Sequence, residues 1–275
     1  MSKDQPLMRL TARDIPPAGI DLMPICPAAL AGLSIDTIRK IRLSSGAKRV
    51  ALGDVFEVEG HCEDTVELRR IDRRCLRVGA GLEQGQIRVR GDVGDEAGRG
   101  MSNGVLKVSG NAGDSLASGL SGGRIEIGGD AGDHLGAPAR GQTKGINRGV
   151  VIVKGNVGNH AAARMRRGVV VIHGSAGTYL GERMIAGTIV VLGSTDRHLG
   201  TGMRRGTFVL TEMAKSPGFA ENGNYELPFL KVLFSQLENI DPSLRKYIKK
   251  TKTAQRWLGD LAHGGLGEVL VVEKP

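Results

Sequence analysis

Residues 149–158 read GVVIVKGNVG, and residues 168–177 repeat the pattern as GVVVIHGSAG. The arrangement recurs through residues 85–210 as units that begin at glycine, carry apolar residues two and four places on, and mostly return to glycine at the sixth place. The spacing between unit starts is 19 residues, with one spacing of 26, for starts at Gly85, Gly104, Gly123, Gly149, Gly168, Gly187 and Gly206. A regular period of this length indicates a solenoid.

Five positions of each unit are apolar, counted from the first glycine as zero: +2, +4, +8, +12 and +16. The +3 position between the first two is polar in the early units, as Arg88, Lys107 and Glu126 illustrate. Such alternation is typical of a strand with one buried face. Glycine at +6, and usually at +9, would break a helix. We therefore predict an all-β fold, a right-handed parallel β-helix of 19-residue coils with like residues stacked about 4.8 Å apart.

Three segments are predicted along the chain. Prolines interrupt residues 1–48, which we interpret as an irregular N-terminal lead-in with one short strand through Ile38, Ile41 and Leu43. Residues 49–210 form the predicted β-helix, in which the first coils are degenerate because they close an open end.

Residues 211–275 form a predicted C-terminal extension that caps the β-helix. Residues 211–225 read as a loop, because they contain Pro217, Gly218, Asn222 and Gly223. An amphipathic helix follows, with its apolar face at Leu227, Leu230, Leu233, Phe234 and Leu237. Helical spacing continues to Ile248, and residues 269–272 are a predicted last strand.

The composition of the chain excludes several classes of partner. A net charge of +9 suits nucleic acid, an acidic partner or an anionic ligand, but 3% aromatic residues supply no stacking platform, so we expect no nucleic-acid partner. The chain start has no apolar signal segment, and no run approaches the ~20 residues of a membrane span. The three scattered cysteines form no CxxC pair. We predict a cytoplasmic protein without a membrane partner.

Histidines recur at position +11, where His134 and His160 fall in adjacent coils and Tyr179 and His198 follow. Adjacent rings allow a metal site in principle, and an independent metalloenzyme using His134 and His160 is one hypothesis. Stacked corner side chains are the favoured interpretation, because no third ligand is evident. We predict no metal on this chain.

A polar column at +7 is the second candidate for chemistry, and it comprises Asp92, Asn111, Asp130, Asn156, Ser175 and Ser194. Paired carboxylates could act in acid–base catalysis. Amides and hydroxyls in the same column favour corners whose side chains bond nearby backbone N–H groups. The glycine-rich strings match neither a Walker loop nor a strand–GxGxxG–helix unit. We expect no catalytic residues on this chain.

Arginines gather at the coil starts. Arg148, Arg167 and Arg205 precede the first glycine of three coils, and Arg166 and Arg204 stand one place earlier. Stacking would place them on one edge. That edge is either a solvated surface that opposes aggregation or a docking site for an acidic partner or anionic ligand. The insertion, loop 136–145, is a second candidate contact.

These motifs resemble those of a known family. The repeat Gly-x-Ile/Val-x-Val-x-Gly-Asp/Asn-x-Gly, the Met-x-x-Gly junctions, the string Gly-Asp-Ala-Gly-Asp-His and the tail segment 218–230 resemble the C subunit of formylmethanofuran dehydrogenases. They equally resemble the related C subunit of the bacterial formyltransferase/hydrolase complex. The repeat alone is similar to the β-helical C-terminal domain of glutamate synthase large subunits.

The resemblance implies a non-catalytic structural subunit beside A, B and D subunits in a hetero-oligomer. Such complexes transfer a formyl group from formyl-tetrahydromethanopterin to a methanofuran-type carrier and hydrolyse it to formate, in the formaldehyde oxidation of methylotrophs. The alternatives are the methanogen complex that reduces CO2, or a stand-alone β-helical scaffold. An Arg-, Ala- and Gly-rich composition favours the methylotroph complex.

The same resemblance bears on ligands. It implies no cofactor on this chain and a metal in the A subunit. Because the family's carrier has a glutamate-rich tail, Arg148, Arg167 and Arg205 could contact it. The sequence therefore leaves the surface, rather than an internal site, as the candidate for function.

Overall fold

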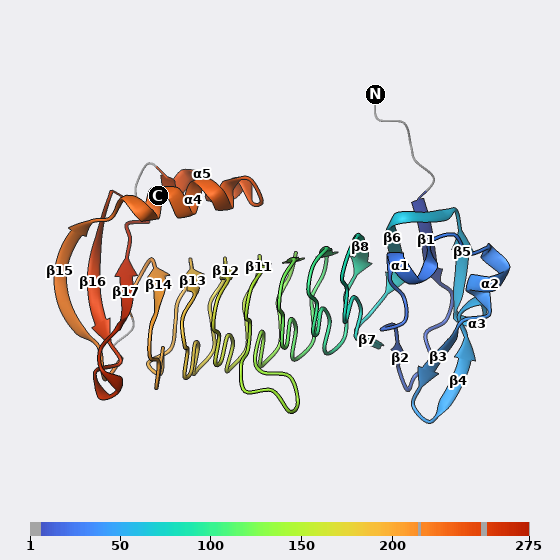
Figure 1. Cartoon of the computed structure of the whole chain (residues 1–275), viewed down its shortest axis with the longest axis horizontal. Helices are drawn as coiled ribbons and strands as arrows, with labels where there is room; N and C mark the ends of the chain where they lie inside the picture. The colour runs from blue at the N-terminus through green and yellow to red at the C-terminus, as the bar shows by residue number, and fades with distance from the viewer. Residues whose placement is uncertain (1–6, 214–215, 249–251, 275) are drawn as a thin grey trace.

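The computed structural model describes residues 7–213, 216–248 and 252–274 (Figure 1). The described chain is mostly β and contains few helices. One 13-stranded mixed sheet runs along the molecule in the order β15-β16-β17-β14-β13-β12-β11-β10-β9-β8-β6-β1-β5, and two two-stranded sheets accompany it. The central strands therefore follow one another in chain order, as a repeating sequence requires.

Seven short strands form the centre of the large sheet, and each pairs in parallel with its neighbours. They are β8 (Gln86–Gly91), β9 (Val105–Val108), β10 (Arg124–Ile127), β11 (Val150–Val153), β12 (Val169–Ile172), β13 (Thr188–Val191) and β14 (Gly206–Leu210). Val151 lies opposite Ile125 on one side and Val170 on the other. The insertion before β11 therefore leaves the register unchanged, because its extra residues are placed in a loop.

The predicted apolar columns are buried. Side chains at +2 and +4 of the seven strands are buried, and the +12 and +16 residues belong to the same buried cluster. At +8, isolated parallel bridges join successive units from Val93 to Ala176. Further backbone bonds join the +13 glycines to the preceding unit, as from Gly181 N–H to Ala161 carbonyl at 2.8 Å. Each unit thus buries its apolar residues between its own strand and the rest of the unit.

Residues 7–48 are more regular than the sequence indicated, and residues 49–76 add further strands. Three strands extend the large sheet: β1 (Leu7–Ala12), β5 (Phe56–Glu59) and β6 (His61–Ile71). The remaining elements are β2 (Ile20–Asp21), β3 (Arg42–Ser45), β4 (Lys48–Ala51), β7 (Cys75–Leu76), α1 (Pro27–Leu30), α2 (Ile35–Arg39) and α3 (Leu52–Val55). The strand expected through Ile38 is wrong at that residue, which lies in α2. The hydroxyl of Ser34 caps this helix by accepting a bond from Thr37 N–H at 3.3 Å.

The C-terminal segment continues the sheet beyond β14. β17 (Gly267–Val271) pairs in parallel with β14, and β16 (Thr253–Gly259) and β15 (Ala220–Glu226) follow it antiparallel. The last strand was expected; β15 was not, because Asn222 and Gly223 read as a turn. The structure absorbs them in a bulge, where the register shifts between Glu221 and Gly223.

Two helices lie over part of the sheet's outer face. The predicted amphipathic helix is α4 (Pro228–Glu238), followed by η1 (Pro242–Leu244) and α5 (Arg245–Ile248), with η2 (Leu261–His263) nearer the C-terminus. Leu230, Phe234 and Leu237 of α4 are buried against outward side chains of β11–β14. Figure 1 shows α4 and α5 above β11–β14, with no described helix above β8–β10. The outer face is therefore covered over one half only.

Candidate functional site

The +7 column forms a ladder of hydrogen bonds between units. The side-chain oxygen of each member accepts a bond of 2.6–3.2 Å from the backbone N–H of the next member, from Asp92 through Asn111, Asp130 and Asn156 to Ser175 and Ser194. The sequence predicted bonds to nearby backbone; the acceptor instead reaches the adjacent unit. These carboxylates therefore join neighbouring units and are not arranged as an acid–base pair.

A second ladder at +10 was missed by sequence reasoning. Asp95, Asp114, Asp133 and Asn159 each accept a bond of 2.7–3.0 Å from the backbone N–H at +10 of the next unit. Close contact between units explains why a glycine precedes each ladder residue. A methyl group at Gly129 or Gly132 would collide with the side-chain oxygen of the ladder residue in the preceding unit. The paired Gly-Asp steps at +6/+7 and +9/+10 are the sequence signal.

The +11 rings stack as predicted. Ring centroids are 5.2 Å apart for His134 and His160, 5.0 Å for His160 and Tyr179, and 4.7 Å for Tyr179 and His198. Glu182 lies 3.0 Å from Nδ1 of His160. No group of three His, Cys, Asp or Glu side chains in the described residues could hold a metal ion. The column is best explained as stacked corner side chains.

Two of the cysteines are unsuited to nucleophilic chemistry. Burial raises the pKa of Cys62 to about 11 and that of Cys75 to about 12. Both are therefore thiols at neutral pH, whereas the thiolate is the reactive form. All three cysteines, including Cys26, are free.

The structure places the predicted arginines at the strand starts. Bonds such as Val169 N–H to Gly149 carbonyl, 3.0 Å, stack the unit starts, so Arg148 and Arg167 occupy adjacent units. Ala186 occupies the same position in the next unit and separates Arg167 from Arg205. All three arginines are exposed. Within the described residues none forms an ion pair or a side-chain hydrogen bond, so their guanidinium groups face solvent.

Loop 136–145 folds back over the preceding unit. Gly119 N–H donates to the carbonyl of Ala137 at 3.0 Å, and the carbonyl of Thr143 accepts from Arg164 at 3.4 Å. Ala137 and Ala139 are buried, whereas residues 140–144 are exposed. The loop therefore has an anchored base and an exposed tip.

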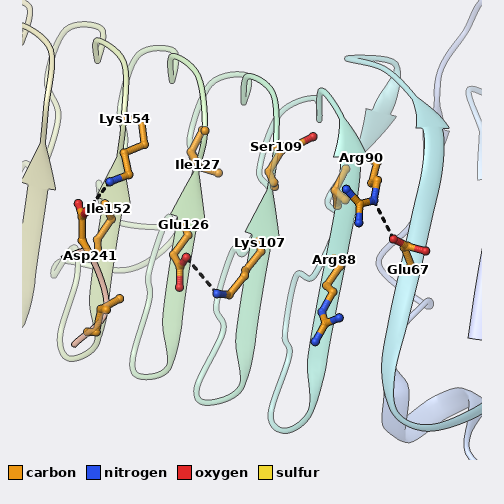
Figure 2. Close-up of a pocket in the computed structure, with 14 residues that line it drawn as sticks. Glu67, Arg88, Arg90, Lys107, Ser109, Glu126, Ile127, Ile152, Lys154 and Asp241 are labelled. Carbon is orange, nitrogen blue, oxygen red and sulfur yellow. Dashed lines mark hydrogen bonds and ion pairs between the residues drawn. The ribbon is translucent and has the colours of Figure 1, made fainter. Parts of the chain in front are cut away.

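A groove of about 300 Å³ crosses the uncovered outer face of β8–β10 (Figure 2). Its charged walls come from outward positions +3 and +5 of successive strands and from β6: Glu67, Arg88, Arg90, Lys107, Glu126 and Lys154. Ile240 and Asp241, between α4 and η1, close one end. We call this feature the outer-face groove.

Asp241 fixes the closed end of the groove. Its carboxylate, 3% exposed, lies 2.5 Å from Nζ of Lys154 and 2.6 Å from Nε2 of His173. Ser243 Oγ donates to it at 2.6 Å. Burial alone would raise the pKa of Asp241, but these donors lower it to about 2. Burial and the nearby Lys154 lower the pKa of His173, which favours the neutral imidazole beside the ionised carboxylate.

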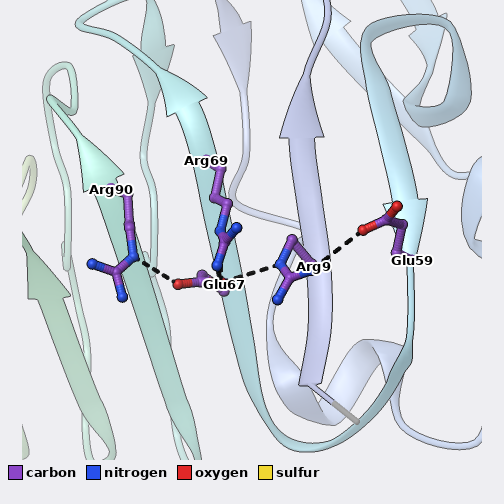
Figure 3. A network of polar contacts seen from close by, with 5 residues as sticks. All are labelled: Arg9, Glu59, Glu67, Arg69 and Arg90. Carbon is purple, nitrogen blue, oxygen red and sulfur yellow. Dashed lines mark hydrogen bonds and ion pairs between the residues drawn. The ribbon is translucent and has the colours of Figure 1, made fainter.

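Glu67 organises the opposite end (Figure 3). Its side chain, 3% exposed, lies 2.9 Å from Arg90, 2.7 Å from Arg69 and 3.3 Å from Arg9, and Arg9 also pairs with Glu59 at 3.4 Å. Burial would raise the pKa of Glu67, but the three guanidinium groups outweigh it and hold the pKa below its usual range. One carboxylate is thus shared by three cations.

A family model described as the GXGXG motif matches residues 65–261. The match spans the central strands, both ladders and the C-terminal segment as far as the residues before β17. The chain belongs to the GXGXG-motif family.

Relatives of this family member include the C subunit of the formyltransferase/hydrolase complex Fhc of Methylorubrum extorquens, 42% identical over 78 residues, which are 28% of this chain and 29% of that protein. The C subunit of the tungsten-containing formylmethanofuran dehydrogenase 2 of Methanothermobacter wolfeii is 36% identical over 89 residues, 30% of this chain and 33% of that protein. The aligned part thus spans about a third of the curated relatives it matches.

The structural match extends over nearly all of the chain. A chain in the X-ray structure of the formyltransferase/hydrolase complex FhcABCD from Methylorubrum extorquens, in complex with methylofuran, superposes with a TM-score of 0.87 at 40% identity. The superposition covers 96% of this chain and 98% of that one. Separately, none of the helices in the described residues has both the length and the apolar character needed to cross a membrane.

Proposed function

We propose that this chain is the non-catalytic structural C subunit of a formyltransferase/hydrolase complex. The complex would transfer a formyl group from formyl-tetrahydromethanopterin to a methanofuran-type carrier and hydrolyse it to formate. The observation that carries the proposal is the match at 40% identity to a chain of FhcABCD over 96% of this chain. Its partners would be the A, B and D subunits in a cytoplasmic hetero-oligomer. The higher identity to the Fhc protein favours this complex over the methanogen dehydrogenase.

We further propose that the central units form a right-handed parallel β-helix of 19-residue coils. Parallel pairing of β8–β14, the bridges at +8 and the two side-chain ladders support this architecture. The proposed domains are 1–48, 49–210 and 211–275. A rigid stack of this kind suits a subunit that holds others in place.

We expect the chain to hold no cofactor or metal of its own, so that the carriers and the metal belong to the other subunits. Arg148, Arg167 and Arg205 are proposed to contact an anionic carrier tail or an acidic partner, because all three are exposed at unit starts and the first two occupy adjacent units. Replacing all three with glutamate should weaken affinity for the carrier. Unchanged carrier affinity in an intact complex would remove this part of the proposal.

Affinity purification of the tagged chain from its native host tests the main proposal. We expect three further subunits to co-purify in fixed ratio, together with activity that forms formate from formyl-tetrahydromethanopterin. Recovery of the chain alone, as a monomer, would contradict it. Metal analysis provides a second check, because stoichiometric zinc or iron in the isolated chain would favour the independent-enzyme hypothesis.

A further inference from the structure

The outer-face groove has an unbalanced set of charges. Three carboxylates line it, Glu67, Glu126 and Asp241, and each is already engaged by cations. Glu126 lies 3.2 Å from Lys107 and 2.8 Å from Arg124. Arg88 forms no ion pair among the described residues; its guanidinium donates only to Gln86, at 3.0 Å. The groove therefore presents unsatisfied positive charge to solvent.

The surrounding ion pairs strengthen this imbalance. Seven cations and four carboxylates belong to the groove and the ion-pair network connected to it: Arg9, Arg69, Arg88, Arg90, Lys107, Arg124 and Lys154 against Glu59, Glu67, Glu126 and Asp241. His173 is counted as neutral, because burial and Lys154 lower its pKa. The excess is therefore three positive charges. Arg90 contributes to this excess, and 70% of its side chain is exposed to solvent.

The shape of the groove suits an extended segment. Gly128, directly after β10, has no side chain, and Ser109, directly after β9, has a small one, so a channel stays open between Arg90 and Lys154. Ile152 and Ile240 form an apolar wall at the closed end. From Arg90 on β8 to Lys154, which follows β11, both at +5, is three strand spacings, roughly 14 Å. That distance corresponds to about four residues of extended chain.

We propose that the outer-face groove binds an extended acidic segment of a partner subunit, with carboxylates on Arg88 and Lys107 and an apolar side chain against Ile152 and Ile240. The inference rests on the proposed function and deepens it by naming a docking surface. A line of cations spread over three strand spacings fits several carboxylates on one chain better than one small anion, which needs converging donors. The lining contains no aromatic side chain on which a nucleic-acid base could stack.

Photo-crosslinking in the assembled complex tests which segment occupies the groove. A photoreactive amino acid replaces exposed Ser109, and the same residue at exposed Lys48 on the β3–β4 hairpin is the control. We expect the Ser109 probe, but not the Lys48 probe, to crosslink to a segment of another subunit that contains at least two Asp or Glu residues. A crosslink to a second copy, to a segment without carboxylates, or to nothing in an intact complex would overturn the proposal.

Charge reversal supplies an independent measurement. Arg88→Glu combined with Lys107→Gln should raise the Kd for the partner subunits about tenfold, and the effect should shrink at high salt. The control pair, Lys48→Glu with Arg49→Gln, makes the same charge change on the exposed hairpin. Equal affinities for the two variants, both with wild-type unfolding temperature, would overturn the groove proposal. If instead the wild-type chain retains no partner, the proposed function itself fails.

Discussion

The two halves of the outer sheet face share one inner core yet differ in what covers them. In β8–β10 the +3 residues are Arg88, Lys107 and Glu126; in β11–β14 they are Ile152, Val171, Val190 and Val209. The apolar half packs against α4 and α5, whereas the charged half lines a groove. The inner columns thus specify the stack, and the +3 column specifies where the C-terminal helices bind.

Burial energies explain the boundary. Removing an aliphatic side chain such as Val190 from water contributes about 1.5–3 kcal/mol, and four stacked residues of this kind form an apolar stripe. Covering Arg88 or Lys107 with an apolar helix would instead bury unpaired charge. Helix α4 ends near β11, where the apolar stripe also ends. Asp241, which follows α4, forms an ion pair there with Lys154.

The largest expected effect is in the covered half. Val190→Asp places a carboxylate under α4 without a cation and should lower the free energy of unfolding by about 3–4 kcal/mol. Arg88→Asp, at the same unit position in the uncovered half, should change it by less than about 0.5 kcal/mol. Urea unfolding measures both. Similar decreases in unfolding free energy for the two variants would show that both halves of the outer face are equally exposed to solvent.

The junction of the halves gives the next largest effect and depends on pH. The pKa of Asp241 falls from 3.8 to about 2 on folding, so its contribution is present above pH 4 and is lost as pH falls through 2. Asp241→Ala should therefore lower the unfolding free energy by about 2 kcal/mol at pH 7. Wild-type and variant stabilities, measured from pH 7 to pH 2, should converge at the acid end; a constant difference would contradict this.

Within the uncovered half, Glu67 should matter moderately. Glu67→Gln removes the charge shared by three arginines and should lower the unfolding free energy by about 1 kcal/mol, because the freed guanidinium groups can still bind water. Glu59→Gln is the matched control, since that side chain is 54% exposed. Thermal unfolding in parallel would reveal the difference. Equal decreases in stability for the two variants would mean that the buried ion pairs of Glu67 stabilise the fold no more than the exposed pair of Glu59.

The smallest effect is expected at Lys107. Its side chain is 42% exposed and pairs with Glu126, so Lys107→Ala should change the unfolding free energy by about 0.5 kcal/mol or less. Any effect should vanish in high salt. A loss above about 1 kcal/mol in urea unfolding would show that the groove charges support the fold, rather than being available for a partner.

Much of the repeat was predictable. Glycine starts and apolar columns gave the strands, the buried positions and the stacked rings, because each unit repeats the same local requirements. Helix α4 was also predicted from its amphipathic spacing, and the last strand was predicted from its apolar residues. For the +7 ladder, the sequence predicted that the side chains bond to backbone N–H groups at a corner. It did not predict that these N–H groups belong to the next unit, because that depends on how closely the units approach.

Other features needed the folded chain. Asn222 and Gly223 read as a turn, yet antiparallel pairing with β16 draws β15 into the sheet through a bulge. Arg148, Arg167 and Arg205 were predicted to lie on one edge, and the structure adds that all three are exposed. The groove was not predicted, because Glu67, Lys107 and Asp241 are distant in sequence and none belongs to a recognisable motif.

The sequence by itself determined the stack, because a 19-residue period fixes which side chains lie inside and which positions of successive units lie next to one another. Only the tertiary structure decided how that stack is used at its surface. Whether an outward residue is covered depends on where α4 and α5 end, and this follows from contacts such as Lys154 with Asp241, which lie 87 residues apart. Long-range docking of this kind leaves no periodic signal in the chain.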